Sequence, residues 1–246
     1  MTIAERLMHI GSFILPARVS DYARHIIKWE VFSERILENP LIIRHIPEKK
    51  SIILDVGSRY SQIPLELAAL GHSVYALDIE EYAFKHKNLT YVKEDIRKTS
   101  FPDNFFDVVT IVSTLEHVGM GETAYHDKKE RNGDATAMKE ILRILKPGGI
   151  VLLTVPFGKA KFLPFLRVYD KERIKLISKG FAVTKEIYMY NDNENWEIST
   201  YQKVKDIQNT HHTIGNGFFI FTSIKKTDPK AVLIRKIASP RLKKQG

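Results

Sequence analysis

Beyond Pro47, short unbroken apolar runs alternate with segments whose apolar residues recur every three or four positions. Unbroken apolar runs of this length are typical of buried strands, and the wider spacing is typical of amphipathic helices. Strands that alternate with helices predict an α/β fold, a doubly wound and mostly parallel seven-stranded sheet. The predicted strands are 52–56, 73–78, 89–95, 105–113, 150–157, 181–190 and 218–224, and the predicted helices are 61–70, 134–145 and 170–180.

The helix that follows residue 133 has clear signals at both ends. Asp134 stands at its start, and Met138, Ile141 and Leu145 recur at helical spacing along one face. The segment 146–149, Lys-Pro-Gly-Gly, is expected to end it, because proline cannot continue a helix. The helix therefore connects the fourth predicted strand to the fifth.

Two polar segments, 117–134 and 191–217, are longer than most connections in a compact domain. In a doubly wound sheet, ligands bind at the carboxyl ends of the strands. We therefore expect the two segments and the strands that end in acidic residues to share one edge of the sheet.

The two ends of the chain differ from the middle in their pattern of apolar and charged residues. Residues 20–37 place Tyr22, Ile26, Trp29, Ser33 and Ile36 at steps of three and four, which predicts an amphipathic helix with Ser20 as its N-cap. We expect a helical extension over residues 1–49, a main domain over 50–224 and a basic tail over 225–246.

Composition narrows the classes of function. The 246 residues include 43% hydrophobic side chains, enough for a sizeable core, and no cysteine, which excludes disulfides, thiolate metal sites and cysteine nucleophiles. No apolar run reaches the roughly 18 residues of a membrane span, and the first residues lack a clean signal-peptide cleavage site. We therefore expect a cytoplasmic protein.

The formal net charge of +9 is concentrated in the tail, where residues 224–246 hold eight lysines and arginines against Asp228 alone. The rest of the chain is close to neutral, so charge does not indicate a basic active-site groove. The tail suits an anionic membrane surface, an RNA or a protein partner, and a solvated tail is the commonest alternative.

The stretch LDVGSRYS (54–61) joins an acid-ended strand to a helix through one glycine, and YALDIE (75–80) ends the next strand in Asp78. Asp78 lies 23 residues beyond Asp55, close to the roughly 20-residue spacing of the acid that binds a ribose diol in nucleotide-binding units. The two acids together indicate a nucleotide-like ligand, although single acids at strand ends are usually caps.

These pieces, with VKEDIRKTSFPDNFFDVV (92–109), STLEHVG (113–119) and ILRILKPGGIVLLTVP (141–156), resemble the class I S-adenosylmethionine-dependent methyltransferases over residues 50–224. The chain is also similar to bacterial methyltransferase-like proteins linked to surface-polysaccharide synthesis. The resemblance implies a Rossmann-like methyltransferase fold with an antiparallel last strand, S-adenosylmethionine as cofactor, and a lid formed by residues 1–49.

The resemblance also implies a cofactor site. Backbone amides of the turn would meet the carboxylate of the cofactor, Asp55 its ammonium group and Asp78 its ribose diol. Two isoleucines would flank the adenine, and Asp95 would accept from its amino group. The full predicted set is Asp55, Gly57, Ser58, Arg59, Asp78, Ile79, Asp95, Ile96 and Ser113.

The turn departs from the family pattern of three alternating glycines, because Arg59 and Ser61 replace the last two. A methyl donor has no pyrophosphate that requires close backbone approach, so one glycine can suffice, which favours S-adenosylmethionine over a dinucleotide. Arg59 can reach the cofactor carboxylate or an acidic substrate, or crowd the site. A domain that has lost cofactor binding is the alternative.

Glu116 and His117 follow the fourth strand, where the methyl group would face its acceptor. A hydroxyl acceptor gains from a base with a pKa near neutrality, and His117 is the candidate by type and place. The alternative is that the pair only shapes the loop. In the polar segments, Tyr125, Trp196 and Tyr201 either line an acceptor pocket or anchor the loops, and we expect no metal at His126, Asp127, His211 and His212.

The sequence therefore predicts a methyltransferase that acts on oxygen or nitrogen of a small-molecule or glycan-like acceptor. The motif STLE (113–116) lacks the Asn/Asp-Pro-Pro-aromatic signature of base amino methylation, which argues against nucleobase substrates. The alternatives are an RNA or protein methyltransferase that uses the basic tail, and a non-catalytic interaction module that keeps the fold.

Overall fold

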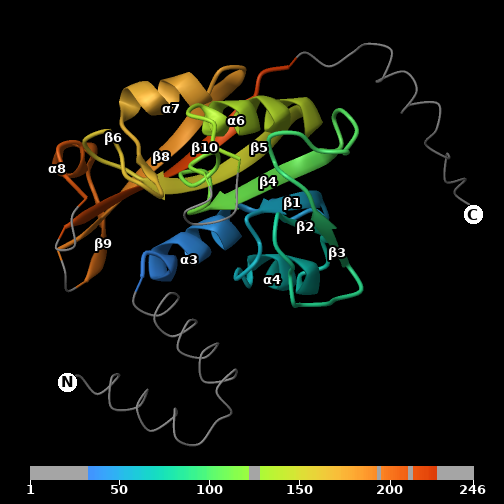
Figure 1. Cartoon of the computed structure of the whole chain (residues 1–246). Helices are drawn as coiled ribbons and strands as arrows, with labels where there is room; N and C mark the ends of the chain where they lie inside the picture. Colours follow the sequence, from blue (N-terminus) through green and yellow to red (C-terminus); the bar gives the residue numbers. More distant parts are fainter. Residues whose placement is uncertain (1–32, 122–127, 193–194, 210–212, 226–246) are drawn as a thin grey trace, which may run out of the picture.

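A computed structural model describes residues 33–121, 128–192, 195–209 and 213–225. Its centre is an eight-stranded sheet with the strand order β3-β2-β1-β4-β5-β10-β8-β9 (Figure 1). The strands are β1 (Ile52–Val56), β2 (Ser73–Asp78), β3 (Leu89–Lys93), β4 (Phe106–Val112), β5 (Leu145–Pro156), β8 (Phe181–Asn191), β9 (Trp196–Ser199) and β10 (Ile214–Ser223).

The first five strands of the sheet pair in parallel, and β10 lies antiparallel between β5 and β8. This arrangement confirms the predicted doubly wound, mostly parallel sheet with an antiparallel last strand. The seven predicted strands are all present, and β9 adds an eighth at the edge, antiparallel to β8. The loops that follow β1, β2 and β4 therefore leave the sheet at one edge, as predicted for a ligand site.

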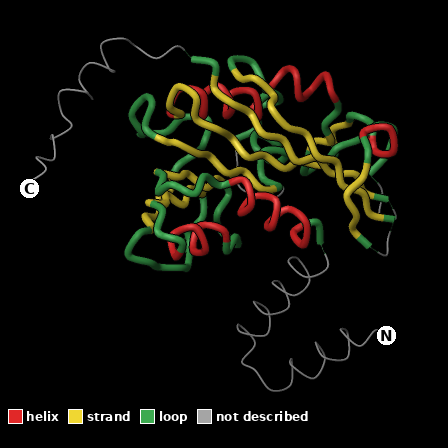
Figure 2. The backbone as a smooth tube through the Cα atoms, turned by 180° about the vertical axis from the view of Figure 1, so that it is seen from behind, coloured by secondary structure: helices red, strands yellow, loops and turns green. Residues whose placement is uncertain are grey.

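Helices cover both faces of the sheet. In Figure 1, α3 (Arg35–His45) and α4 (Ile63–Ala69) lie below the sheet, whereas α6 (Gly133–Ile144) and α7 (Lys171–Ile177) lie above it. Figure 2 shows the same layering from behind. Two buried hydrophobic clusters fill the layers, one that includes Ile42, Ile63 and Leu67 and one that includes Met138 and Ile174.

The predicted helix boundaries differ from the structure in several places, and α4 and α7 are shorter than the predicted helices 61–70 and 170–180. Of the predicted helix 20–37, residues 20–32 lie outside the described residues, and α3 continues past residue 37, through Pro40, to His45. Ile36, predicted on the apolar face, is half exposed, and Ile42 is buried instead. The helix α6 ends at Ile144, so the Lys-Pro-Gly-Gly segment (146–149) already belongs to β5.

The structure contains short elements that the sequence pattern did not predict. Residues 191–217 include β9 and α8 (Tyr201–Val204), and a small separate hairpin of β6 (Lys161–Phe162) and β7 (Arg167–Val168) follows β5. Elements of two to four residues are too short for hydrophobic periodicity to reveal.

Among the described residues, no helix is long and apolar enough to cross a membrane. The basic tail from residue 226 lies outside the described residues.

Candidate cofactor and acceptor site

The turn after β1 is tight and is held by backbone hydrogen bonds. Gly57 has a φ of 79°, in the left-handed region that favours glycine, and its N–H donates to the Leu77 carbonyl over 2.9 Å. A Cβ atom at residue 57 would lie only 2.2 Å from Thr114 Oγ1, so the turn packs directly against the loop that follows β4. The single glycine of the motif is therefore required by both its backbone angle and its contact.

Asp55 lies at the carboxyl end of β1, and its side chain is 2% exposed. Its two carboxylate oxygens accept hydrogen bonds from Ser58 Oγ (2.9 Å) and Thr110 Oγ1 (2.5 Å). Burial raises the pKa of Asp55 to about 6, although these two hydrogen bonds oppose the rise. The carboxylate thus ties β1, its turn and β4 together.

Asp78 ends β2 and faces the same turn. Its carboxylate oxygens accept from the backbone N–H groups of Arg59 and Glu80, each over 2.9 Å. Burial raises the pKa of Asp78 despite these hydrogen bonds. Ile79, the next residue, is half-buried. The predicted acids Asp55 and Asp78 are therefore brought together on the two sides of one turn.

The amides of this turn already have acceptors within the protein. The N–H groups of Gly57 and Ser58 both donate to Leu77, and the N–H of Arg59 donates to Asp78. The Arg59 guanidinium lies over the ring of Tyr60, 4.8 Å from its centroid. The predicted contact between these amides and a cofactor carboxylate stays a prediction, and it requires some of these donors to change partners or to be shared.

Asp95 and Ile96 follow β3 at the same edge. Asp95 receives four hydrogen bonds from Arg97, three from the guanidinium and one from the backbone N–H. Burial alone would raise the pKa of Asp95, but the contacts with Arg97 outweigh it and lower this pKa. Ile96 is buried in the core. An adenine amino group would therefore share Asp95 with Arg97, and the role predicted for Asp95 stays a prediction.

Ser113, at the end of β4, connects segments that are distant in the sequence. Its φ of 43° is rare for a residue other than glycine, and its Oγ donates to Glu38 Oε1 over 2.7 Å. The same oxygen of Glu38 accepts from Asn216 Nδ2 over 2.9 Å. Glu38 and Asn216 are buried, and sequence reasoning identified neither, because α3 and β10 meet here only in the folded chain.

Glu116 and His117, the pair predicted to be catalytic, follow Ser113 in the loop after β4. Glu116 is 2% exposed, burial raises its pKa well above the usual range, and its Oε2 has no hydrogen-bond partner among the described residues. His117 Nδ1 lies 2.7 Å from the carbonyl oxygen of Phe165, which can only accept, so Nδ1 carries the proton. Burial lowers the pKa of His117. The neutral ring therefore has its basic nitrogen at Nε2, 3.8 Å from Glu116 Oε1.

Arg35 is a positive charge at this edge of the sheet that the sequence analysis missed. Its Nη1 donates to the Val112 carbonyl over 3.2 Å, and its Nε lies 3.7 Å from Glu38 Oε2. Its charge acts on the carboxyl groups of Asp55 and Glu116, where it opposes the rise in pKa that burial causes. Burial and the neighbouring Glu38 raise the pKa of Glu34 to about 7. The pattern Glu-Arg-x-x-Glu in residues 34–38 was the sequence signal that could have indicated a group of charged side chains here.

The other predicted loop residues have different outcomes. Tyr201 packs against Phe157 and Tyr188, with Lys171 Nζ 5.1 Å from the centroid of its ring, and Trp196 packs against the core. These contacts fit the anchoring alternative, and the acceptor-pocket alternative for the two residues stays a prediction. Tyr125, His126, Asp127, His211 and His212 lie outside the described residues. Within the described part of the chain, no group of three or more potential metal ligands is found.

Comparisons with known proteins agree with this geometry. Residues 54–153, from β1 to β5, match the family model of a methyltransferase domain. The ubiquinone/menaquinone biosynthesis C-methyltransferase UbiE of Shewanella pealeana is 35% identical over 104 residues, which are 42% of this chain and 36% of that protein. The chain therefore matches only about a third of the length of this curated relative.

Solved structures share the fold at low identity. The 1,6-didemethyltoxoflavin-N1-methyltransferase of Burkholderia thailandensis, solved with S-adenosylhomocysteine, matches with a TM-score of 0.60 at 13% identity over 90% of each chain. A methyltransferase of Methanosarcina mazei matches with a TM-score of 0.54 at 17% identity, over 76% of this chain and 98% of that one. Residues 54–153 therefore match a methyltransferase-domain family, and the chain shares the fold of solved S-adenosylmethionine-dependent methyltransferases, as its sequence predicted.

Proposed function

We propose that the protein transfers a methyl group from S-adenosylmethionine to an oxygen or nitrogen atom of a small-molecule or glycan-like acceptor. The observation that carries this proposal is the joint placement of Asp55, Gly57 and Asp78 around one turn, within the segment that matches the methyltransferase family. In this proposal Asp78 meets the ribose diol of the cofactor and Asp55 meets its amino end.

Methyl transfer is an in-line displacement, so positioning supplies most of the catalysis. The acceptor atom attacks the methyl carbon, the bond from carbon to sulfur breaks, and the sulfonium becomes a neutral thioether. A hydroxyl or amine acceptor must also lose a proton. His117 Nε2, unprotonated in the tautomer that Phe165 holds, is the group that we propose takes this proton.

Carbon methylation is a second candidate, supported by the name of the curated relative from Shewanella pealeana. The similarity covers only 42% of this chain, and the solved methyltransferase named for an N1 position shares the fold over 90% of it. Acceptor sites in this fold are built by loops that vary between relatives, so the shared segment does not select the acceptor atom.

An RNA or protein methyltransferase and a non-catalytic module are two further candidates. The RNA or protein methyltransferase would use the basic tail to hold an anionic partner. The non-catalytic module is supported by the turn amides, which already donate to Leu77 and Asp78. Cofactor binding separates this module from all of the candidate enzymes.

The test is calorimetric titration of the purified full-length protein with S-adenosylmethionine and S-adenosylhomocysteine. We expect Asp78→Asn to weaken binding about 10- to 100-fold, because a hydrogen bond to a charged group contributes about 1.5–3 kcal/mol. Asp103→Asn is the matched control, because Asp103 is exposed and pairs with Arg143 away from the turn. If the folded wild type binds neither compound, the enzyme proposal is wrong and the non-catalytic module remains.

A further inference from the structure

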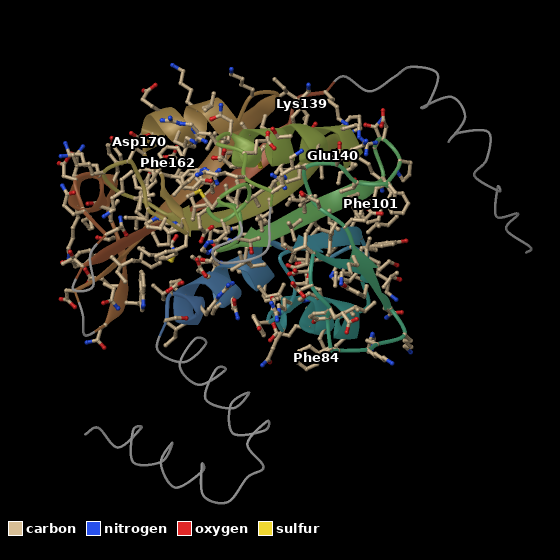
Figure 3. The ribbon with its side chains drawn as sticks, viewed as in Figure 1. Phe84, Phe101, Lys139, Glu140, Phe162 and Asp170 are labelled. Carbon is tan, nitrogen blue, oxygen red and sulfur yellow. The ribbon has the colours of Figure 1, made fainter. Side chains whose placement is uncertain are left out.

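The β6–β7 hairpin packs against the loop that carries Glu116 and His117. Its turn is closed by a hydrogen bond from the Leu163 N–H to the Leu166 carbonyl over 2.8 Å. Within that turn, the carbonyl of Phe165 accepts from His117 Nδ1. In Figure 3 the hairpin can be found by Phe162, which lies near Asp170 at the start of α7. The hairpin is therefore the direct support of the candidate base.

Arg167, in β7, joins the hairpin to that loop. Its backbone N–H donates to the Glu116 carbonyl over 3.0 Å, and its Nη1 donates to the carbonyls of Val118 (2.6 Å) and Glu116 (3.2 Å). Its Nη2 donates to the carbonyls of Glu130 (3.2 Å) and Arg131 (3.1 Å). One guanidinium thus holds the backbone immediately before and after His117, and also the far end of the same loop.

A guanidinium in this position is costly unless its donors are satisfied. Arg167 is 1% exposed, and both of its Nη atoms donate to backbone carbonyls. Its Nε has no hydrogen-bond partner among the described residues and lies 3.9 Å from Asp134 Oδ1, whose carboxylate balances the charge. Asp134 is itself held by Arg173 Nη2 (2.6 Å) and by the hydroxyl of Tyr169 (3.0 Å). A buried ion pair therefore fixes the backbone of this loop, although apolar residues of similar volume would stabilise the core equally well.

We propose that Arg167 is a positioning residue that sets the tautomer of His117. By holding the carbonyls of Glu116 and Val118, it keeps the His117 ring against the Phe165 carbonyl, so the proton stays on Nδ1 and the basic nitrogen is Nε2. The inference rests on the proposed function for its purpose, because a fixed tautomer matters only if His117 accepts a proton. The tautomer itself is measurable without any acceptor.

The experiment is long-range proton–nitrogen NMR of the full-length protein labelled with ¹⁵N at histidine, recorded at pH 7. The His117 signals are assigned by their loss in His117→Gln. We expect the wild type to show the Nδ1–H tautomer. Arg167→Met, which keeps the apolar stem and removes every side-chain donor, should lower the ratio of the Nδ1–H to the Nε2–H form about two- to tenfold, as loss of one net hydrogen bond implies.

Two further variants separate positioning from general damage. Arg173→Met removes a partner of Asp134 but leaves the donors to Glu116 and Val118, so we expect the wild-type tautomer. Arg167→Lys keeps the charge and some donors, and should give an intermediate ratio, which also provides the measurement if Arg167→Met does not fold. Circular dichroism and thermal unfolding of each variant confirm that the fold is intact.

Each outcome bears on a different claim. An Nε2–H tautomer in the wild type, or an unchanged ratio in folded Arg167→Met, would overturn the inference. An equal change in Arg173→Met would assign the effect to the Asp134 network and would also overturn it. Failure of S-adenosylhomocysteine to bind in the titration would remove the proposed function, whereas the tautomer result would stand independently.

Discussion

Replacement of Gly57 by alanine tests how the turn after β1 is built. The residue has a φ of 79°, and a Cβ atom there would lie 2.2 Å from Thr114 Oγ1, 2.3 Å from its Cγ2 and 2.7 Å from its Cβ. Because the Cβ of Thr114 is itself too close, rotation of the threonine side chain cannot relieve the clash. The backbone of the loop after β4 must move, three residues before His117.

The magnitude has two parts. A residue with a Cβ in the left-handed region costs about 1–2 kcal/mol, and overpacking a tight contact costs about 1–3 kcal/mol. We therefore expect Gly57→Ala to lower the free energy of unfolding by about 2–5 kcal/mol. Its affinity for S-adenosylhomocysteine should also fall, because the turn and the loop after β4 both border the candidate site.

The matched control is Gly148→Ala. Gly148 has a φ of 71°, and a Cβ atom added there meets nothing within 4 Å, so this variant carries the backbone cost alone, about 1–2 kcal/mol. Urea denaturation of both variants isolates the steric part as their difference. In the double variant Gly57→Ala with Thr114→Gly, removal of the threonine side chain should recover most of that difference.

The result that would refute this reasoning is equal destabilisation by Gly57→Ala and Gly148→Ala, since it would show that Thr114 does not restrict the turn. Failure of the double variant to recover stability would also count against it, because the clash would then involve other atoms.

Two predictions concern pH. Folding raises the pKa of Asp55 from 3.8 to about 6, so its protonated form favours the folded state below pH 3.8, and this contribution is lost as the pH rises through about 6. Relative to Asp55→Asn, the wild type should lose about 2.4 kcal/mol of unfolding free energy between pH 4 and 7 by urea denaturation, and a constant difference would contradict the burial argument. Burial would raise the pKa of Glu140 (labelled on α6 in Figure 3), but hydrogen bonds from Arg143 and Thr99 outweigh it and lower this pKa to about 2. The stability that results from this lowered pKa is present above pH 4.5 and is lost as the pH falls through about 2. Glu140→Gln should therefore lower the free energy of unfolding by about 1 kcal/mol at pH 7, a value reduced by the exposure of Arg143, and by nothing near pH 2. An equal cost at both pH values would show that charge is not involved.

Much of the fold was predictable from the sequence because its central strands β1, β4 and β5 are mostly buried on both faces. The run 52–56 and the run 150–157 have no polar interruption beyond Asp55 and Thr154, and such runs leave little choice of structure. The helix from Asp134 was recognisable from its spacing. The edge strand β9 was not, because Glu197 and Ile198 are both exposed and the strand has no buried face to give a pattern.

The candidate site also contains residues that the sequence could predict and residues that it could not. Asp55, Gly57 and Asp78 are close to one another because each lies at or just beyond the end of a strand in one parallel sheet, and their spacing along the chain is enough to predict this. Glu38, Asn216 and Arg167 belong to α3, β10 and β7, and they meet the segment that begins at the end of β4 only once the chain is folded. No local pattern marks Asn216 or Arg167, and the Glu-Arg-x-x-Glu pattern that contains Glu38 does not reveal its partners on β4 and β10.

The sequence by itself determined the order of the strands and helices, the resemblance to the methyltransferase family and the acids beside the turn after β1, since these depend on residues near one another in the chain. Only the tertiary structure decided which groups satisfy those acids and the turn amides, and which nitrogen of His117 carries its proton. The physical reason is that a buried polar group takes its pKa and its tautomer from whatever lies within hydrogen-bond distance, and those neighbours come from distant parts of the chain.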